Sequence, residues 1–277
     1  MSKRWIMIGI LDSGIGGLRA ARELLDRVPD ADLIYFGDTA RSPYGVKHGD
    51  TIRRNASEGL KFLLAAGATI ICIPCSDISG AGFDLPDGLP RRSIIDAVSA
   101  GTHAALALPQ LNRIGIIGTP ATIASHAFER ALAAAKPGAR VYANPCPLIV
   151  PLVEAGRLTK PETFRIIKNC VSPLKRRRVD TLILACSHFA VLRRTIQRKI
   201  GKRVFLVDAA EAAVADTATR ISGSPGAVSR GKTSRFVVTD RSEYVEHAAR
   251  ILFGGPVALE LAPIPPIRSE TSPPEAS

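Results

Sequence analysis

Short apolar runs, each closed by a polar or glycine-rich turn, recur along the chain and predict buried strands. Ile8-Gly9-Ile10-Leu11 leads into the turn 12–17, and Ile114-Gly115-Ile116-Ile117 leads into 118–122. Apolar residues follow the first turn at helical spacing over 18–28, and Thr119 can cap a helix with Pro120 at its first position. Strand, tight turn and helix therefore form the predicted repeating unit.

Further strands and helices alternate along the chain. The other predicted strands are 32–36, 69–73, 92–95, 141–143, 182–185, 203–207 and 236–239. The other predicted helices are 51–66, 124–135, 161–171, 189–200 and 244–253. This alternation favours mostly parallel sheets flanked by helices, a fold class in which ligands bind at the carboxyl ends of the strands.

Two cysteine motifs follow equivalent strands. Cys75-Ser76-Asp77 comes after the run 69–73, and Cys186-Ser187-His188 comes after the run 182–185. The cysteines are 111 residues apart, and the opening strands, counted from Ile8 to Ile114, are 106 residues apart. Because two separate landmarks repeat at nearly the same distance, we expect duplicated halves.

The sequence thus predicts two similar three-layer α/β domains. The first comprises 1–100 plus 210–262, because the strand and helix over 236–253 are expected to return to it, and the second comprises 101–209. Residues 263–277 hold five prolines and almost no large apolar side chains, so they predict a disordered tail.

Cysteine usage and hydropathy bound the compartment. No run approaches the roughly 18 apolar residues of a membrane span, and the apolar run after the basic start is too short for a signal peptide. Five cysteines without an export signal indicate free thiols rather than a disulfide framework. We expect a cytoplasmic protein in which Cys72, Cys146 and Cys170 are small buried hydrophobic residues.

The net charge of +12 suits nucleic acid, an acidic membrane surface or small anionic substrates. The densest basic run, Lys175-Arg176-Arg177-Arg178, precedes an apolar strand. Only 5% of the residues are aromatic, and no nucleic-acid motif is visible. We interpret the run as a solvated turn and expect neither a nucleic-acid nor a membrane partner.

The repeated thiol indicates a specific chemistry. Cysteines at the ends of equivalent strands can face one substrate carbon from opposite sides, which is the arrangement that removes a proton and returns it inverted. A thiolate is a suitable base in a dry site, and the pKa of a thiol falls beside cations or at a helix N-terminus. The sequence predicts such a setting for Cys75 and Cys186, and hence a racemase that needs no cofactor.

Three other chemistries fit less well. Cys72-Ile73-Pro74-Cys75 has the spacing of a redox pair, but residues three apart on a strand point to opposite faces. Cys186 and His188 have the wrong spacing for a zinc ligand pair. Pyridoxal phosphate needs a phosphate cradle and an isolated lysine, whereas the glycine turn here starts with the carboxylate of Asp12. We therefore predict no metal and no cofactor.

Four ordered motifs closely resemble those of the glutamate racemase family, within the aspartate/glutamate racemase superfamily. They are Asp12-Ser13-Gly14-x-Gly16-Gly17, Gly37-Asp38-Thr39-x-x-x-Pro43-Tyr44-Gly45, Gly118-Thr119-x-Ala121-Thr122, and Cys146-Pro147-Leu148-x-Val150-Pro151-Leu152-Val153-Glu154-x-Gly156. The resemblance runs to about residue 262. It implies two α/β domains with the active site in the cleft between them, usually as a homodimer, and supply of D-glutamate for peptidoglycan without a cofactor.

The resemblance also implies roles for individual residues. Cys75 and Cys186 are expected to be the two catalytic acid/bases, with Asp12 assisting Cys75 and with His188 and Glu154 assisting Cys186. The expected substrate-binding residues are Ser13, Pro43, Tyr44, Gly45, Ser76, Asp77, Thr119, Thr122 and Ser187.

The cysteine motifs depart from the family pattern. Cys75-Ser76-Asp77 stands where the family has Cys-Asn-Thr, and Cys186-Ser187-His188-Phe189-Ala190 stands where it has Cys-Thr-His-Tyr-Pro. Two like charges about 4 Å apart repel by roughly 4 kcal/mol at an effective dielectric constant near 20, so an ionised Asp77 would oppose an anionic substrate. Asp77 could pair with the substrate ammonium, turn toward Arg41 or Lys47, or be protonated. A racemase for a different amino acid or a related acid, and a non-catalytic ligand-binding protein, therefore stay open as alternatives.

Overall fold

The larger of two parallel sheets has six strands in the order β12-β11-β3-β2-β4-β5. The computed structural model describes residues 4–109, 113–223, 227–228 and 233–262. The strands of this sheet are β2 (Met7–Asp12), β3 (Asp32–Gly37), β4 (Ile70–Ile73), β5 (Ile94–Asp96), β11 (Ser234–Val238) and β12 (Leu259–Leu261). The chain thus returns to its first sheet at its C-terminal end, as predicted. A separate short parallel pair joins β1 (Arg4–Trp5) and β10 (Ala227–Val228).

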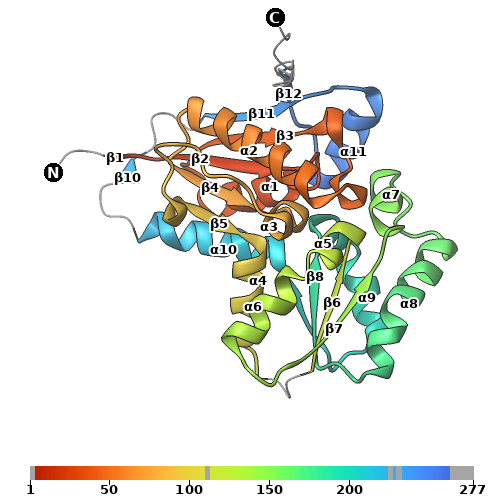
Figure 1. The fold of residues 1–277 in the computed structure, drawn as a ribbon. Coiled ribbons are helices and arrows are strands. Elements are labelled where there is room, and N and C mark those ends of the chain that lie inside the picture. Colours follow the sequence, from red (N-terminus) through yellow and green to blue (C-terminus); the bar gives the residue numbers. More distant parts are fainter. Residues whose placement is uncertain (1–3, 110–112, 224–226, 229–232, 263–277) are drawn as a thin grey trace, which may run out of the picture.

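The second sheet repeats the topology of the first. Its strands are β6 (Arg113–Gly118), β7 (Arg140–Pro145), β8 (Thr181–Ala185) and β9 (Phe205–Asp208), in the order β7-β6-β8-β9. In both sheets the first strand of the repeat lies between the second and the third, and the fourth is at an edge. Figure 1 shows the six-stranded sheet in the upper half of the view and the four-stranded sheet in the lower half.

Eleven α-helices and four 3₁₀ helices occupy the described part of the chain. The α-helices are α1 (Leu18–Arg27), α2 (Gly49–Ala65), α3 (Ser76–Ala81), α4 (Ala97–Leu106), α5 (Pro120–Ala124), α6 (Ala127–Ala135), α7 (Ile149–Glu154), α8 (Pro161–Arg176), α9 (Arg193–Ile200), α10 (Ala209–Ser222) and α11 (Glu243–Phe253). The 3₁₀ helices are η1 (Thr39–Arg41), η2 (Tyr44–Val46), η3 (Arg91–Ser93) and η4 (Ser187–Leu192).

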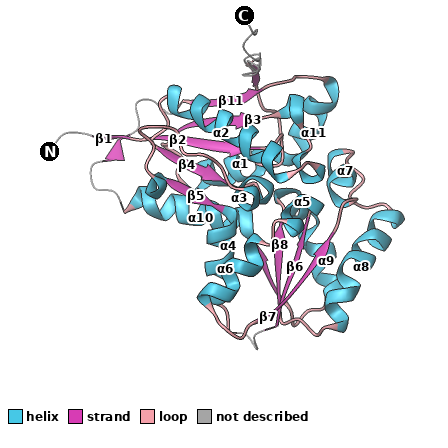
Figure 2. Ribbon diagram, in the orientation of Figure 1, coloured by secondary structure: helices cyan, strands magenta, loops and turns pink. Residues whose placement is uncertain are grey.

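Helices cover both faces of each sheet (Figure 2). In the larger sheet Ile8 and Ile10 pack in the core that includes α1, whereas Leu11 packs with α2 on the opposite face. In the smaller sheet Leu184 faces α8 and α9, whereas its neighbour Ile183 faces α4 and α6. Strands buried on both faces explain the near-continuous apolar runs of the sequence. The predicted fold class, two similar α/β units with parallel sheets, is confirmed.

Some predicted elements differ in extent. The expected helix over 124–135 begins only at Ala127, as α6, because His126 adopts a left-handed conformation (φ 50°) that separates it from α5. The expected helix over 189–200 begins as the 3₁₀ helix η4, and α8 continues past Pro173 to Arg176. The predicted domain boundaries fall within α4 and at the start of α10, two helices that pack against each other, and they stay a prediction. The predicted disordered tail, 263–277, lies outside the described residues.

One expectation about the cysteines is wrong. Cys146 and Cys170 are joined by a disulfide, with their Cα atoms 5.7 Å apart, whereas Cys72 is free and buried as expected. The bond links the segment between β7 and α7 to helix α8. A separation of 24 residues gives no sign of this contact, because the fold alone brings the two thiols together. No helix within the described residues has the length and apolar character needed to cross a membrane.

Candidate active site

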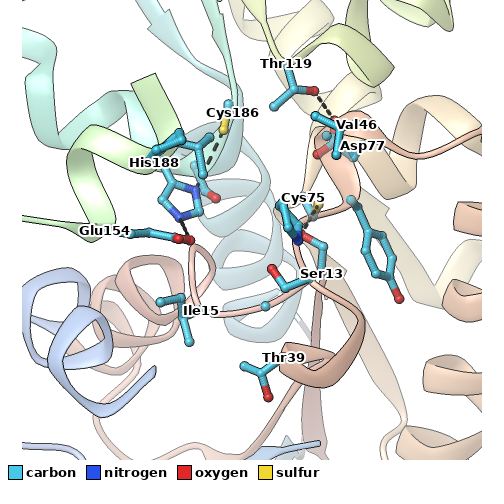
Figure 3. Close-up of a pocket in the computed structure, with 18 of the residues that line it drawn as sticks. Ser13, Ile15, Thr39, Val46, Cys75, Asp77, Thr119, Glu154, Cys186 and His188 are labelled. Atoms are coloured by element: carbon cyan, nitrogen blue, oxygen red, sulfur yellow. Dashed lines mark hydrogen bonds and ion pairs between the residues drawn. The ribbon is translucent and has the colours of Figure 1, made fainter. Parts of the chain in front are cut away.

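A cavity of about 390 Å³ lies between the two sheets, at the carboxyl ends of their strands. This volume is within the usual range for small-molecule sites. Figure 3 shows Cys75 and Cys186 among the residues around it. The predicted site residues that line it are Ser13, Pro43, Tyr44, Gly45, Cys75, Ser76, Asp77, Thr119, Glu154, Cys186, Ser187 and His188. Asp12 and Thr122 do not line it but bond to residues that do.

Cys75 lies where β4 ends and α3 begins. It is the N-cap residue of α3 and is 5% exposed. Its thiol donates a hydrogen bond to Ser13 Oγ at 3.3 Å. Ser13 belongs to the turn after β2, so the neighbouring strands β2 and β4 together place this thiol at the cavity wall.

Asp12 lies behind this wall, at the end of β2. Its Oδ2 accepts hydrogen bonds from the Gly14 amide at 3.1 Å and from the Tyr35 hydroxyl at 3.2 Å. Burial raises the pKa of Asp12, and the Gly17 amide, His188 and the Gly14 amide partly oppose that rise. Asp12 is therefore a buried carboxyl group whose proton affinity is increased close to Cys75.

Cys186 lies in the second domain, at the position after β8 that corresponds to Cys75 after β4. His188 Nδ1 is 3.8 Å from its sulfur, and His188 Nε2 is 3.0 Å from Glu154 Oε1. Glu154 is the last residue of α7, and its Oε2 accepts a hydrogen bond from the Tyr244 hydroxyl at 2.7 Å. A chain of contacts thus runs from thiol to imidazole to carboxylate to phenol.

The electrostatics of this chain keep Glu154 ionised. Burial alone would raise the pKa of Glu154, but the hydrogen bond and charge of His188, together with the Tyr244 hydroxyl, outweigh it and lower the pKa. Partial burial raises the pKa of Tyr244, and its hydrogen bond to Glu154 raises it further. Glu154 is therefore a carboxylate that can orient the imidazole of His188.

The predicted lowering of the cysteine pKa values is wrong. Burial raises the pKa of Cys75, and the carboxyl groups of Asp12 and Asp77 raise it further. Burial also raises the pKa of Cys186, and Asp77 again adds to the rise. Desolvation and nearby negative charge outweigh the short helices that follow each cysteine. These raised pKa values favour the thiol form of both groups.

Asp77 is bonded to two of the hydroxyls that were predicted to bind substrate. Thr122 Oγ1 donates to Asp77 Oδ1 at 2.6 Å, and Thr119 Oγ1 donates to the same oxygen. The alternative in which Asp77 turns toward Arg41 is wrong, because Arg41 bonds to Asp38 and Glu58 instead.

Two glycines allow the domains to approach across the cavity. A Cβ atom on Gly16 would lie 2.5 Å from His188 Cε1, and one on Gly45 would lie 2.8 Å from Thr119 Cβ. Both distances are shorter than van der Waals contact. The glycine turns of the first domain therefore lie directly against the residues of the second domain that follow β6 and β8.

Motif reasoning missed several lining residues. Tyr244, Ser242 and Asp240 line the cavity from the segment that begins α11, and Tyr244 also bonds to Glu154. These residues lie in no recognisable motif, and the only available signal was the expected return of this segment to the first domain. Among the described residues no group of three or more His, Cys, Asp or Glu side chains could hold a metal ion.

Comparison with known proteins agrees with this geometry. Residues 16–217 match the family described as Asp/Glu/Hydantoin racemase. The chain is 39% identical over 237 residues to glutamate racemase from Neisseria gonorrhoeae, which covers 84% of this chain and 87% of the relative. It is 38% identical over 211 residues to glutamate racemase from Syntrophus aciditrophicus, covering 76% of this chain and 78% of the relative.

A solved structure extends the match to the fold. Glutamate racemase from Francisella tularensis, in complex with D-glutamate, superposes with a TM-score of 0.84 at 30% identity, over 94% of this chain and 98% of that one. Two duplicated α/β units, a thiol after the third strand of each, and these matches lead to one assignment. The chain belongs to the Asp/Glu/hydantoin racemase family.

Proposed function

We propose that this protein is a glutamate racemase that interconverts L- and D-glutamate with Cys75 and Cys186 as its two acid/bases. The observation that carries the proposal is the placement of the two thiols. They follow topologically equivalent strands of two duplicated sheets and line one cavity. A planar carbanion between them can be protonated on either face.

The reaction balances with these two groups alone. One cysteine, as thiolate, takes the α-hydrogen: an S–H bond forms, the C–H bond breaks, and the electron pair is delocalised into the α-carboxylate. The other cysteine, as thiol, gives its proton to the opposite face and becomes the thiolate. The reverse reaction exchanges their roles, so neither direction requires an external acid or base.

Formation of the first thiolate depends on the substrate, because burial and nearby carboxyl groups raise the pKa values of both thiols. Within the described part of the chain, no Lys or Arg side chain lines the cavity. The substrate ammonium is therefore a cation that can favour a thiolate there. Two sets of groups are placed to receive the thiol proton: Asp12 beside Cys75, and His188 with Glu154 beside Cys186.

Racemisation followed by circular dichroism, with loss of the α-hydrogen signal in deuterated water, tests the proposal. The wild type should racemise both enantiomers of glutamate, and Cys75→Ser or Cys186→Ser should reduce kcat by about 100-fold or more. Cys72→Ala is the matched control, because Cys72 is a free buried thiol of the first domain that does not line the cavity. It should keep the wild-type rate.

Two results would overturn the assignment. Both enantiomers of glutamate, aspartate and alanine are tested as substrates, and the first such result is that the wild type racemises neither enantiomer of glutamate. The other is either active-site serine variant retaining the wild-type rate.

The wider role that we propose is supply of D-glutamate for peptidoglycan. The homodimer and the cytoplasmic location stay predictions, which sedimentation equilibrium and cell fractionation test. The disulfide between Cys146 and Cys170 makes the test of the cytoplasmic location informative, because stable disulfides are rare in reducing compartments.

A further inference from the structure

We propose that Asp77 determines substrate specificity as a neutral carboxylic acid, donating a hydrogen bond from Oδ2 to a carboxylate of the bound amino dicarboxylic acid. This inference rests on the proposed function, since it takes such an acid to be the substrate. The resemblance already implied that Asp77 binds substrate; the inference specifies its protonation state, the oxygen that donates and the substrate group that accepts.

The hydrogen bonds at Asp77 favour the protonated form. Both Thr119 and Thr122 donate to Oδ1, and no hydrogen bond from another described residue reaches Oδ2. An ionised carboxylate has two equivalent acceptor oxygens, whereas a protonated one has a carbonyl oxygen that accepts and a hydroxyl that donates. Two donors on one oxygen and none on the other match the second pattern. The free Oδ2 is then a donor at the cavity wall.

The charge of the cavity also favours a neutral Asp77. Among the described residues that line it, Asp77, Glu154 and Asp240 have carboxyl groups, none is Lys or Arg, and the imidazole of His188 is bonded to Glu154. A substrate with two carboxylates and one ammonium brings a further net negative charge into this space. Uncharged donors are therefore what the side chains beside Asp77 can offer to its carboxylates.

Ser76 supplies a second, independent sign of a ligand at this place. Its side chain is 2% exposed and lines the cavity, yet its Oγ has no hydrogen-bond partner among the described residues. Buried hydroxyls are nearly always hydrogen-bonded, so a ligand oxygen is the expected partner. Ser76 Oγ and Asp77 Oδ2 would together bind one carboxylate.

The titratable groups around Asp77 come from several elements. Asp12 at the end of β2, Cys75 at the end of β4, and Cys186 and His188 after β8 act on it or are acted on by it. Three charged side chains of neighbouring helices pair elsewhere: Arg53 of α2 with Asp84, Glu58 of α2 with Arg41, and Glu129 of α6 with His126. His103 of α4 lines a different cavity, and α5 presents the two threonine hydroxyls.

The balance of these influences agrees with the geometry. Burial raises the pKa of Asp77, the hydroxyls of Thr119 and Thr122 oppose that rise, Asp12 adds to it, and His188 opposes it. The net direction is upward. Asp77 thus binds a dicarboxylate best below its raised pKa and repels it above that value.

Calorimetric titration with D-glutamate tests this role through the difference between the wild type and Asp77→Asn. The asparagine keeps an acceptor for the two threonines and a donor toward the cavity, but it has no charge at any pH. Above the ordinary carboxyl range, wild-type affinity should fall as the pH rises through the raised pKa of Asp77. Asp77→Asn should match the wild type on the acidic side of that fall and bind about tenfold tighter on its basic side.

Asp240→Asn is the matched control, since it removes a second carboxylate that lines the cavity but is exposed. It should retain the wild-type fall of affinity with pH. The proposal is overturned if wild-type affinity rises with pH and Asp77→Asn weakens binding about tenfold, because Asp77 would then be an anion paired with the ammonium. Glutarate, which lacks the ammonium, should show the same pH dependence as D-glutamate in the wild type; loss of that dependence would also overturn it.

Turnover separates this inference from the proposed function. Tight, pH-dependent binding without racemisation would overturn the racemase assignment and still support the role of Asp77. Racemisation with the same pH dependence of binding in the wild type and Asp77→Asn would support the enzyme and overturn the role of Asp77.

Discussion

His188 illustrates how single residues of this site depend on contacts that no motif records. Its imidazole lies between the thiol of Cys186 and the carboxylate of Glu154, and Tyr244 holds that carboxylate from the other domain. Glu154 does not need to touch the substrate to affect catalysis. It is a positioning residue, because it fixes the ring orientation and tautomer of His188.

Replacing Glu154 with Gln should therefore lower kcat more than it changes KM. The amide keeps the size of the side chain but removes the charge that stabilises a protonated imidazole, so we expect a loss of about tenfold or more in kcat. Tyr244→Phe is the control. It removes one hydrogen bond to the same carboxylate and leaves the charge, so its effect should be about threefold or less. Initial rates from circular dichroism at saturating and limiting substrate measure both constants; an unchanged kcat in Glu154→Gln would contradict the positioning role.

The sequence was informative about which residues form the site and uninformative about their electrostatic state. Cys75 and Cys186 were identified from their places after equivalent strands, and both line the cavity. The direction of their pKa shifts was wrong, because it depends on burial and on Asp12 and Asp77, which pack nearby only in the fold. Residue types and spacing do not contain those distances.

At the scale of elements, the end of α8 combines a regular motif with an unfavourable residue. The amide of Arg178 bonds to the carbonyl of Lys175 at 3.0 Å, and that of Val179 bonds to the carbonyl of Leu174 at 3.4 Å. This is the Schellman pattern, and the buried side chains of Val179 and Leu174 belong to one core, as that motif favours. The pattern requires a left-handed residue, which here is Arg178 with φ 53°.

Arg178→Gly should raise the free energy of unfolding. The left-handed conformation costs an ordinary residue roughly 1–2 kcal/mol, and the greater unfolded-state freedom of glycine cancels roughly 0.4–1 kcal/mol of the gain, so the net effect is about 0.5–1 kcal/mol. Urea denaturation followed by far-ultraviolet circular dichroism measures it. Arg176→Gly removes the same charge two residues earlier, at the last helical position of α8, and should destabilise by about 0.5–1 kcal/mol. Equal effects of the two variants would show that charge, not backbone conformation, is responsible.

Elements with strong periodicity were predictable, and those shaped by tertiary contacts were not. The strands β2, β3 and β8 lie within a residue or two of their predicted bounds, because buried β-branched runs between turns have few other structures available. Helix α10 was missed because alanine and threonine dominate it and give little amphipathic contrast. It is helical because it packs between α1 and α4.

At the scale of the whole molecule, duplication places the chemistry in one cleft, and much of the positive charge lies at the opposite end of the second domain. Residues 163–204 hold twelve Lys and Arg and one acidic residue, Asp180, so they carry +11 of the net charge of +12. All of these cations except Lys199 are exposed. Because the strands are parallel, the cations before β8 and β9 lie at the amino ends of the strands. Arg113 and Arg140, register partners at the starts of β6 and β7, lie at the same end of the sheet. Cys186 lies at the opposite end, where the strands finish.

This concentration of like charge predicts that added salt stabilises the protein. Raising the NaCl concentration from about 0.01 M to about 0.1 M shortens the screening length from roughly 30 Å to roughly 10 Å, which weakens repulsion within the basic edge more than it weakens the few ion pairs there. We expect the unfolding temperature, measured by calorimetry, to rise by about 2 °C or more.

Neutralising Arg176, Arg177 and Arg178 to Gln should reduce this rise. Neutralising Arg22, Arg53 and Arg235, which pair with Asp26, Asp84 and Glu260, should not reduce it, because it removes attractions that salt would have weakened. A fall in the unfolding temperature with salt would mean that attraction between opposite charges, rather than repulsion at this edge, dominates the electrostatic energy of the folded chain.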